Sequence, residues 1–497
     1  MGGRSGLTGP RARGRGATES PPAPYRVPTS RRGSVTQRRR WSRHEIALIG
    51  LFVVSLPLIT PYIRGDGVKY YAWLRSAVID ADLHFLNEYR HGDPIFKDYY
   101  LTPDGSLEPQ FWTRTDHVEN QAGTGEALLW LPFFLIGHGV VLIGQALGAA
   151  WQADGYALPY VWFTSFGTAL YVLAGLLLSF RLARRIADPG PAMLATLAVW
   201  GATSLPVYQY FLPIKGVAMT VLPATVVLWL WLRPSWRLGR WLFLGLLSAF
   251  LVSIHPVAVA WTMLPLVSLL GLDTGTAAQR LRATAAFLAG AVIGALPQLL
   301  GKAIVYGNPL ETGYPEEVLR LLDPDFACVL VGSCRGFLAW TPITGLALAG
   351  LGLLVRVDRR TAIGLWAVFL SMLYLIAIKV TVDISSFGNR FSVIFTPGLI
   401  LGAAVLAHAV WKRWRILAVG LVAIAVMWNG LLAFQWAWGM LPKRGDIDWS
   451  QVARAQFTTA PPELRRAVVL FFTDRGELVR IMQRRDLERL RDQEGIQ

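Results

Sequence analysis

The sequence predicts an all-α polytopic membrane protein. The 497-residue chain is 53% hydrophobic, only 16% of its residues are charged, and its mean hydropathy is +0.41. This balance lies outside that of soluble globular chains, so most of the chain is expected to lie in lipid. Because a bilayer offers the backbone no hydrogen-bond partners, the lipid-embedded segments are expected to be helices.

The basic charge of the chain is concentrated in a tail, residues 1–43. This segment carries eleven Arg and one Glu, which is +10 of the formal net charge of +16. It is rich in Gly, Pro, Ser and Arg, so we expect a disordered cytoplasmic tail that touches anionic lipid headgroups and does not bind nucleic acid. No small-residue cleavage site follows the first apolar run, which favours an uncleaved signal anchor in a bacterial inner membrane.

Twelve apolar stretches are candidate crossings. They cover 45–63, 126–148, 158–180, 191–209, 216–232, 241–254, 256–272, 283–301, 336–355, 361–379, 392–410 and 416–440. Five basic clusters lie between them: Arg181-Arg184-Arg185, Arg233-Arg237-Arg240, Arg280-Arg282, Arg356-Arg359-Arg360 and Lys412-Arg413-Arg415. The positive-inside rule places all five clusters in the cytoplasm only if one stretch, 126–148, is re-entrant or interfacial. Pro132, His138 and several Gly weaken that stretch, so we predict about 11 transmembrane helices.

The predicted organisation has three parts. A transmembrane domain, 44–440, follows the tail and carries outer loops at 64–157, 302–335 and 380–391. The pair of short apolar stretches broken at His255-Pro256 is expected to form a hairpin whose tip reaches the outer face. Residues 441–497 are expected to be an amphipathic tail on the outer face, because 480–492 mixes both signs of charge.

The two cysteines, Cys328 and Cys334, both fall in the second outer loop. A disulfide between them is one prediction for an oxidising face. Two unpaired thiols are the equal alternative, because so small a ring gains little from loop closure.

Residues that can carry chemistry are concentrated directly after the first apolar stretch. The chain reads Arg64-Gly-Asp66-Gly-Val-Lys69-Tyr70, and the apolar spacing that follows predicts an amphipathic helix over 67–79 along the membrane surface. A carboxylate at this boundary is costly unless it has a partner or a task. Asp66 is therefore a candidate catalytic residue, but this argument favours capping of the predicted helix at least as much, and the two roles can coexist.

This segment resembles the first outer loop of GT-C glycosyltransferases, above all the protein O-mannosyltransferase and aminoarabinose lipid A transferase groups. The likeness rests on Asp66-x-x-x-Tyr70, then Arg75, then Asp80-x-Asp82-Leu. Those enzymes have Asp-Glu-x-x-Tyr at this place, so the second carboxylate is absent here.

Three later segments extend the resemblance over most of the chain. Ala127-Leu-Leu-Trp130-Leu-Pro132-Phe-Phe is similar to the family's Pro-Pro-Leu-x-Tyr-Trp helix. Tyr306-Gly-Asn308-Pro309-Leu-Glu311-Thr-Gly313-Tyr314 and Ser386-Phe387-Gly388-Asn389-Arg390-Phe391 are similar to segments of uncharacterised bacterial members.

The resemblance implies an enzyme that transfers a hexosyl or pentosyl group, with inversion, from a polyprenyl-phosphate donor. The acceptor would be a protein, lipid or cell-envelope glycan on the extracytoplasmic face, and Asp66 would accept its proton. Cations should hold the donor phosphate: Arg390 first, because it starts a helix after a tight turn, then Lys69, Arg75 and Lys302, with Lys215 and Lys379 also on the outward side. The donor or acceptor pocket is expected to include Tyr70, Asp80, Asp82, Glu88, Asn389 and His255, the last with the alternative of satisfying the broken helix.

Other classes of function are weighed against this one. His117 and Glu119 are weak candidates for a metal, so no cofactor is expected, with a divalent cation as the open alternative. No P-loop, G-x-S-x-G or H-E-x-x-H motif occurs. A secondary transporter or lipid flippase is the main rival, and a non-catalytic scaffold is a third reading. The expected partners are membrane lipids and the lipid-linked donor, and the oligomeric state is not fixed by the sequence.

Overall fold

The structure is a computed structural model that describes residues 2–3, 41–233, 235–313, 319–333, 335–379, 386–442 and 445–494. Two units are distinguished, Met1–Arg39 and Arg40–Gln497, and the fold below is that of the second. Nearly all of the predicted basic tail lies outside the described residues, as does Cys334, so the predictions for the tail and for the disulfide stay predictions.

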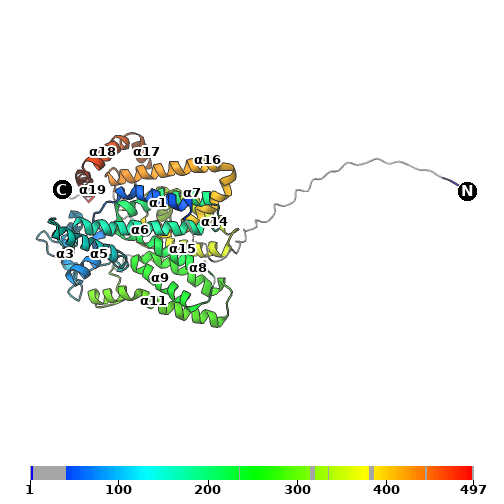
Figure 1. Cartoon of the computed structure of the whole chain (residues 1–497), viewed down its shortest axis with the longest axis horizontal. Coiled ribbons are helices and arrows are strands. Elements are labelled where there is room, and N and C mark those ends of the chain that lie inside the picture. Colours follow the sequence, from blue (N-terminus) through cyan, green and yellow to red (C-terminus); the bar gives the residue numbers. More distant parts are fainter. Residues whose placement is uncertain are drawn as a thin grey trace. The chain divides into compact units, whose positions relative to one another are not determined.

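The described part of the chain is built from helices (Figure 1). The α-helices are α1 Arg43–Ser55, α2 Gly67–Arg75, α3 Leu86–Arg90, α4 Pro94–Tyr100, α5 Gly125–Ala146, α6 Leu158–Ala183, α7 Pro189–Gly201, α8 Val221–Trp231, α9 Leu238–Ile254, α10 Met263–Val267, α11 Ala277–Tyr306, α12 Phe326–Val331, α13 Phe337–Trp340, α14 Ile343–Leu354, α15 Arg359–Ala377, α16 Thr396–Ala437, α17 Trp449–Phe457, α18 Ala460–Thr473 and α19 Arg475–Glu494. Short 3₁₀ or π segments join them: η1 Leu56–Leu58, η2 Ser76–Asp80, η3 Pro109–Phe111, η4 Val207–Phe211, η5 Pro213–Lys215, η6 Val217–Thr220, η7 Pro256–Thr262, η8 Ser268–Leu272 and η10 Arg390–Phe395. Within these residues β-pairing is limited to isolated bridges, so the all-α prediction is confirmed.

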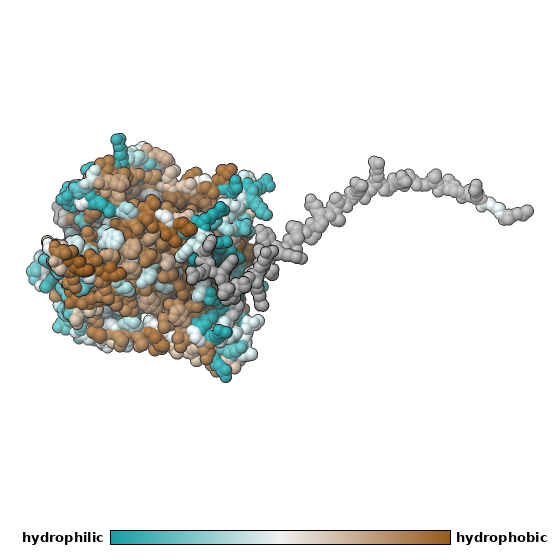
Figure 2. Space-filling view, in the orientation of Figure 1, coloured by the Kyte–Doolittle hydropathy of each residue, from teal (hydrophilic) through white to brown (hydrophobic). Residues whose placement is uncertain are grey.

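Several helices have the length and composition of membrane spans. Among the described residues, five helical stretches qualify: α5, α6, α11, α15 and the run from η10 through α16. The last of these merges two helices across Trp414, whose backbone is non-helical, at the predicted Lys412-Arg413-Arg415 cluster. Figure 2 shows apolar side chains over the flank of the bundle. Among the exposed apolar residues are Leu288 and Val292 of α11. The chain is therefore a polytopic membrane protein, and its count of 11 crossings stays a prediction.

Helix α5, the stretch predicted to be re-entrant, is one continuous helix of 22 residues that runs antiparallel to the first half of α6. Trp130 Nε1 donates to Thr168 Oγ1 at 2.8 Å, and Tyr171 Oη donates to the Leu129 carbonyl at 3.1 Å. Since α6 continues to Ala183, the first turn of α5 lies beside the middle of α6. Helix α5 therefore starts partway along the bundle, although by length alone it is also a candidate crossing.

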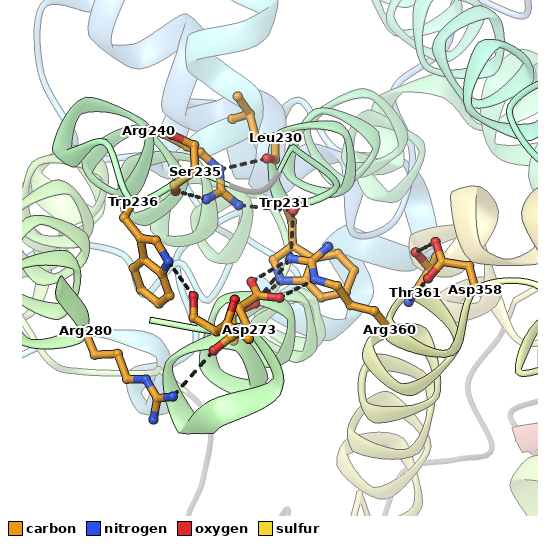
Figure 3. A network of polar contacts seen from close by, with 12 residues as sticks. Leu230, Trp231, Ser235, Trp236, Arg240, Asp273, Arg280, Asp358, Arg360 and Thr361 are labelled. Carbon is orange, nitrogen blue, oxygen red and sulfur yellow. Dashed lines mark hydrogen bonds and ion pairs between the residues drawn. The ribbon is translucent and has the colours of Figure 1, made fainter. Parts of the chain in front are cut away.

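Three of the five basic clusters meet around one carboxylate, Asp273 (Figure 3). Arg360 Nη2 donates to Asp273 Oδ2 at 2.8 Å and to the Trp231 carbonyl at 3.1 Å. Arg240 Nη2 donates to the same carbonyl at 3.1 Å, and Arg280 donates to the Asp273 carbonyl at 3.5 Å. We call these four charged residues the Asp273 cluster. The starts of α9, α11 and α15 are thus brought to one end of the bundle, as the positive-inside rule requires.

The C-terminal tail forms three helices, α17–α19, that fold back onto the segment following α1. Asp486 on α19 accepts from Arg64 Nη1 at 3.1 Å, and Glu463 on α18 accepts from Trp438 Nε1 at 2.6 Å. The described part of the tail is helical, and α19 reaches a residue only two positions before Asp66. Its place on the outer face stays a prediction.

Candidate functional site

Asp66 stands in a tight turn between η1 and α2. Gly65 adopts φ +52°, a conformation that favours glycine, and its amide donates to Asp93 Oδ2 at 2.5 Å. Asp66 occupies the N-cap position of α2, but its side chain accepts no capping hydrogen bond. The capping alternative is therefore wrong, and the carboxylate is available for other partners.

The carboxylate of Asp66 pairs with Arg390, 324 positions later in the chain. Arg390 Nη1 donates to Asp66 Oδ2 at 2.8 Å, while 46% of the Asp66 side chain remains exposed. Gly388, at φ +53°, makes the turn before Arg390, and the Asn389 side chain caps η10 by accepting from the Phe391 amide. The predicted turn and helix start are confirmed, and they aim the guanidinium at Asp66.

Gly67, the position of the missing second carboxylate, packs against the segment that carries Lys215. A Cβ atom at Gly67 would lie 3.2 Å from the Ile214 carbonyl oxygen, which is tighter than ordinary contacts. On the other side of Asp66, the Lys215 ammonium lies 3.6 Å from the place that a Cβ atom of Gly65 would take. The turn therefore has room for Lys215 and little room for a side chain at 67.

Four cations influence the Asp66 carboxylate: Arg390, Lys215, Lys69 and Lys379. Burial raises the pKa of Asp66, but Arg390, Lys215 and Lys69 outweigh it and hold that pKa well below its ordinary value. Burial lowers the pKa of Lys215 and of Lys379 to about 8 in each case. We call these five residues the Asp66 site. Asp93 also acts on Lys215 and Glu119 on Lys69, so among the described residues three carboxylates stand against four cations. Positive charge remains in excess, which suits an anion such as a phosphate.

Lys69 extends the Asp66 site toward a second group of charges. Its ammonium donates to Gln121 Oε1 at 3.1 Å and lies 4.7 Å from the Tyr100 ring centroid. Lys302 donates instead to the carbonyls of Asn120, at 2.8 Å, and Thr312, at 3.3 Å. Glu119 lies near both lysines, and burial raises its pKa despite them. Lys302 thus ties the first and second predicted loops together and is not among the cations around Asp66.

Arg75, expected to hold donor phosphate, belongs to a separate cluster. It pairs with Asp80 and donates to Glu88 Oε1 at 2.6 Å, and its guanidinium lies 4.9 Å from the Tyr156 ring centroid. Burial raises the pKa of Glu88 to about 7, although Arg75 opposes the shift. Two carboxylates neutralise this one arginine, so no excess positive charge is left for a ligand.

Helix α2 does not lie on the membrane surface as predicted. Nearly all its residues are buried in the protein, including the polar Lys69 at 8% and Arg75 at 7% exposure. The helix itself is confirmed, and η2 continues it to Asp80. Its polar face packs against the loop 76–122 and the segment 154–156, because Gln121, Glu88 and the Asp154 carbonyl supply partners that water would otherwise provide.

The remaining predicted pocket residues are divided between the two clusters. Tyr70 lies near Arg390, whereas Asp82 accepts from Ser76 Oγ at 2.5 Å within its own loop. His255 Nδ1 accepts from the Val257 amide at 3.3 Å, so it satisfies the broken helix, and its ring packs 5.1 Å from that of Phe391. Tyr70, His255 and Asn389 therefore border the Asp66 site, and Asp80, Asp82 and Glu88 do not.

No group of three or more His, Cys, Asp or Glu side chains suited to a metal occurs among the described residues. His117 Nδ1 contacts the Thr115 carbonyl at 2.7 Å, and Glu119 accepts from Gln121 at 3.3 Å. Both weak metal candidates are thus occupied by local polar partners.

Sequence reasoning missed one buried acid near the site. Glu126, in the first turn of α5, is fully buried behind Gly216, and within the described chain neither of its carboxyl oxygens has a hydrogen-bond partner. Nothing in its local sequence marks it, because it reads as the start of an apolar helix. Lys215 carries a readable signal, a lone lysine in Pro-Ile-Lys-Gly between two apolar stretches.

No protein-family model and no curated protein matches this sequence. Among solved structures, the crystal structure of ArnT from Cupriavidus metallidurans in the apo state is similar to this chain. The two are 13% identical, with a TM-score of 0.45, over 88% of this chain and 74% of that chain. So distant a likeness carries no conclusion about chemistry, which has to come from the residues of the Asp66 site.

Proposed function

We propose that the protein is a membrane glycosyltransferase that moves a sugar from a polyprenyl-phosphate donor to an acceptor. The observation that carries this proposal is the Asp66 site: one ionised carboxylate, partly exposed, that faces Arg390, Lys215, Lys69 and Lys379. Such a reaction requires a general base and a phosphate-binding site next to each other.

The cations of the site would receive the donor phosphate. Arg390 offers a planar fork of donors, and its Nε is buried without a hydrogen-bond partner in the described chain. Lys215 and Lys379 add charge that neutralises the lipid phosphate as it leaves. Because these side chains supply the positive charge, the proposed reaction needs no cofactor, and dependence on a divalent cation can be tested with a chelator.

Asp66 would act on the acceptor. Its low pKa keeps it ionised, so it can accept the proton of an acceptor hydroxyl as that oxygen attacks the anomeric carbon. The new bond joins the acceptor oxygen to the sugar, the broken bond joins the sugar to phosphate, and the polyprenyl phosphate leaves with the electron pair. When the donor phosphate binds Arg390, the ion pair between Arg390 and Asp66 weakens. The pKa of Asp66 then rises, and the carboxylate becomes a stronger base. A single displacement of this kind inverts the anomeric centre.

The proposed setting is a multi-pass protein of a bacterial inner membrane with a cytoplasmic N-terminus. The Asp273 cluster then marks the cytoplasmic end, and Asp66 lies on the opposite, extracytoplasmic face, where a lipid-linked donor presents its phosphate. Membrane lipids and the donor are its proposed partners.

The test is transfer of label from a panel of radiolabelled polyprenyl-phosphate sugars by reconstituted protein with native membrane extract. Wild type should transfer from at least one donor, and Asp66→Asn should lose about 10²–10⁴-fold in rate, the usual contribution of a positioned base. Asp82→Asn, a matched change in the same loop, should retain activity. Equal rates for wild type and Asp66→Asn would remove the base from the mechanism. Release from no donor by wild type, together with movement of a fluorescent polyprenyl lipid across the bilayer, would instead establish the flippase alternative.

A further inference from the structure

The C-terminal helices enclose a cavity of about 490 Å³ that lies apart from the Asp66 site. We call it the C-terminal cavity. Its walls come from the end of α16, from α17 and from α19, and its polar lining consists of Gln435, Asp448, Gln451, Thr459, Arg485 and Glu488. A volume of this order is typical of small-ligand sites.

One buried polar group of the cavity lacks a partner, and it is a hydrogen-bond acceptor. Gln435 is fully buried, its Nε2 donates to the Val452 carbonyl at 3.5 Å, and its Oε1 has no partner in the described chain. Glu488 is an exposed residue of the lining, and Arg485 is already engaged, because it donates to Glu463 Oε2 at 3.3 Å and packs 4.8 Å from the Trp438 ring centroid. A ligand that reaches Gln435 Oε1 must therefore donate a hydrogen bond to it.

The lining points to hydroxyl groups as those donors. Two carboxylates and two carboxamides stand on a wall that also contains Met440, Leu441 and Val452. Carboxylates and carboxamides accept from hydroxyls, and the apolar wall can cover the C–H face of a sugar ring. An anionic ligand is disfavoured, because within the described lining Asp448 and Glu488 outnumber the one arginine.

Helix α19 connects the C-terminal cavity to the Asp66 site. Arg485 and Glu488 line the cavity, while Asp486 between them pairs at 3.1 Å with Arg64, two residues before Asp66. Helix α19 thus contacts the cavity through one part of its surface and the segment that leads to Asp66 through another. Resting on the proposed function, we infer that the C-terminal cavity binds a neutral glycan segment of the acceptor, remote from the hydroxyl that reacts. Binding energy from such a remote segment would orient that hydroxyl toward Asp66.

The experiment uses full-length protein in nanodiscs and saturation-transfer NMR with neutral oligosaccharides of glucose, mannose, galactose and arabinose. Wild type should bind at least one of them. Glu488→Ala should weaken binding by about tenfold, the cost of one hydrogen bond to a charged group. Ala455→Phe, which fills the cavity, should abolish binding, whereas Glu477→Ala, a matched change on the far part of α19, should leave it unchanged. Thermal unfolding of each variant checks that it is folded.

Binding to none of the oligosaccharides, or equal binding by all four proteins, would overturn the inference. Hydrolysis of the polyprenyl-phosphate sugar, in which water replaces the acceptor, distinguishes failure of this inference from failure of the proposed function. Donor hydrolysis without glycan binding would reject the C-terminal cavity as a glycan site and support the proposed enzyme. Glycan binding without donor hydrolysis would support the glycan site and count against the proposed enzyme.

Discussion

The Asp66 site and the Asp273 cluster contain almost the same charges and differ in what those charges bind. Each has one carboxylate amid several cations, and in each an arginine pairs with the carboxylate at 2.8 Å. In the Asp273 cluster Arg240 and Arg360 also donate to main-chain carbonyls (Figure 3), those of Leu230 and Trp231 at the end of α8. The last carbonyls of a helix lack partners within it, so the arginines complete this helix end together with the Arg233 amide, which donates to the Leu230 carbonyl at 3.2 Å.

The cations around Asp66 are placed differently. Lys215 makes no hydrogen bond or ion pair in the described chain, and the Nε of Arg390 has no partner. A count of charges therefore does not separate a structural cluster from a binding site, whereas the partners of the cations do. In the Asp273 cluster the Nε of Arg280 also lacks a partner in the described chain, but Arg240 and Arg360 are bound to the carboxylate and to the end of α8. In the Asp66 site the whole ammonium group of Lys215 is left for a ligand.

The largest effect is expected from Arg390→Ala. Loss of the guanidinium removes both a phosphate ligand and the partner of Asp66, so kcat/KM for the donor should fall by about 10²–10³-fold. The pKa of Asp66 should rise toward its ordinary value, because Arg390 is the strongest influence that lowers it, and the acidic limb of the pH profile should move to higher pH. Steady-state kinetics over a pH range measure both, and an unshifted acidic limb would exclude Asp66 as the group that titrates.

The reciprocal change, Arg360→Ala, should affect stability and spare catalysis. It removes the ion-pair partner of Asp273 and leaves the Trp231 carbonyl with Arg240 alone, which we expect to cost about 2–4 kcal/mol, given the partial exposure of the pair. Thermal unfolding in detergent should show a lower Tm, while kcat per folded molecule stays near wild type. A normal Tm with lost activity would contradict this prediction, because Arg360 would then act in catalysis and not in stability.

Lys215→Gln should raise the KM for the donor by about tenfold, the value of one charge-assisted hydrogen bond, with a smaller change in kcat. Lys97→Gln, which removes an amine from α4 in the first loop, is the control and should behave as wild type. A fall in kcat with unchanged KM would place Lys215 against the acceptor and not against the donor phosphate.

Donor binding should also weaken at alkaline pH. A lysine is charged only below its pKa, so Lys215 and Lys379, with pKa values of about 8, lose positive charge as the pH rises through that value. An unperturbed lysine would keep its charge to about pH 10. KM should therefore rise severalfold above about pH 8. In Lys215→Arg, which stays charged, the rise should be smaller, and an identical rise in that variant would exclude Lys215 as its source.

How far the sequence predicts this site depends on the kind of information each residue carries. Asp66 and Arg390 were both selected, because each follows an apolar stretch at the same face and turn residues flank each of them. The predicted topology places both on one side of the membrane, whereas their 2.8 Å contact comes from the fold. Their roles in the reaction stay predictions until transfer is measured.

Other features were beyond sequence reasoning for physical reasons. The periodicity of 67–79 predicts that the helix has a polar face, but it does not predict what that face contacts. In the structure the polar face contacts Gln121 and Glu88 instead of water. Arg75 could not be told from Arg390 by residue type, because only the fold brings it to two carboxylates. The hydropathy of α5 indicates a span, whereas its pairing beside the middle of α6 depends on tertiary contacts such as that of Trp130 with Thr168.

The smallest effect concerns the ion pair between Arg64 and Asp486, which joins α19 to the turn that carries Asp66. Both side chains are partly exposed, so a double-mutant cycle of Arg64→Gln and Asp486→Asn should give a coupling of only about 0.5–1 kcal/mol in stability. Its consequence for transfer should depend on the acceptor. If α19 positions a glycan bound in the C-terminal cavity, either variant raises KM for the acceptor about two- to fivefold, in line with that coupling, and leaves donor hydrolysis unchanged. If donor hydrolysis falls as much as transfer, the pair instead holds the Asp66 turn in shape, and α19 is part of the support of the Asp66 site.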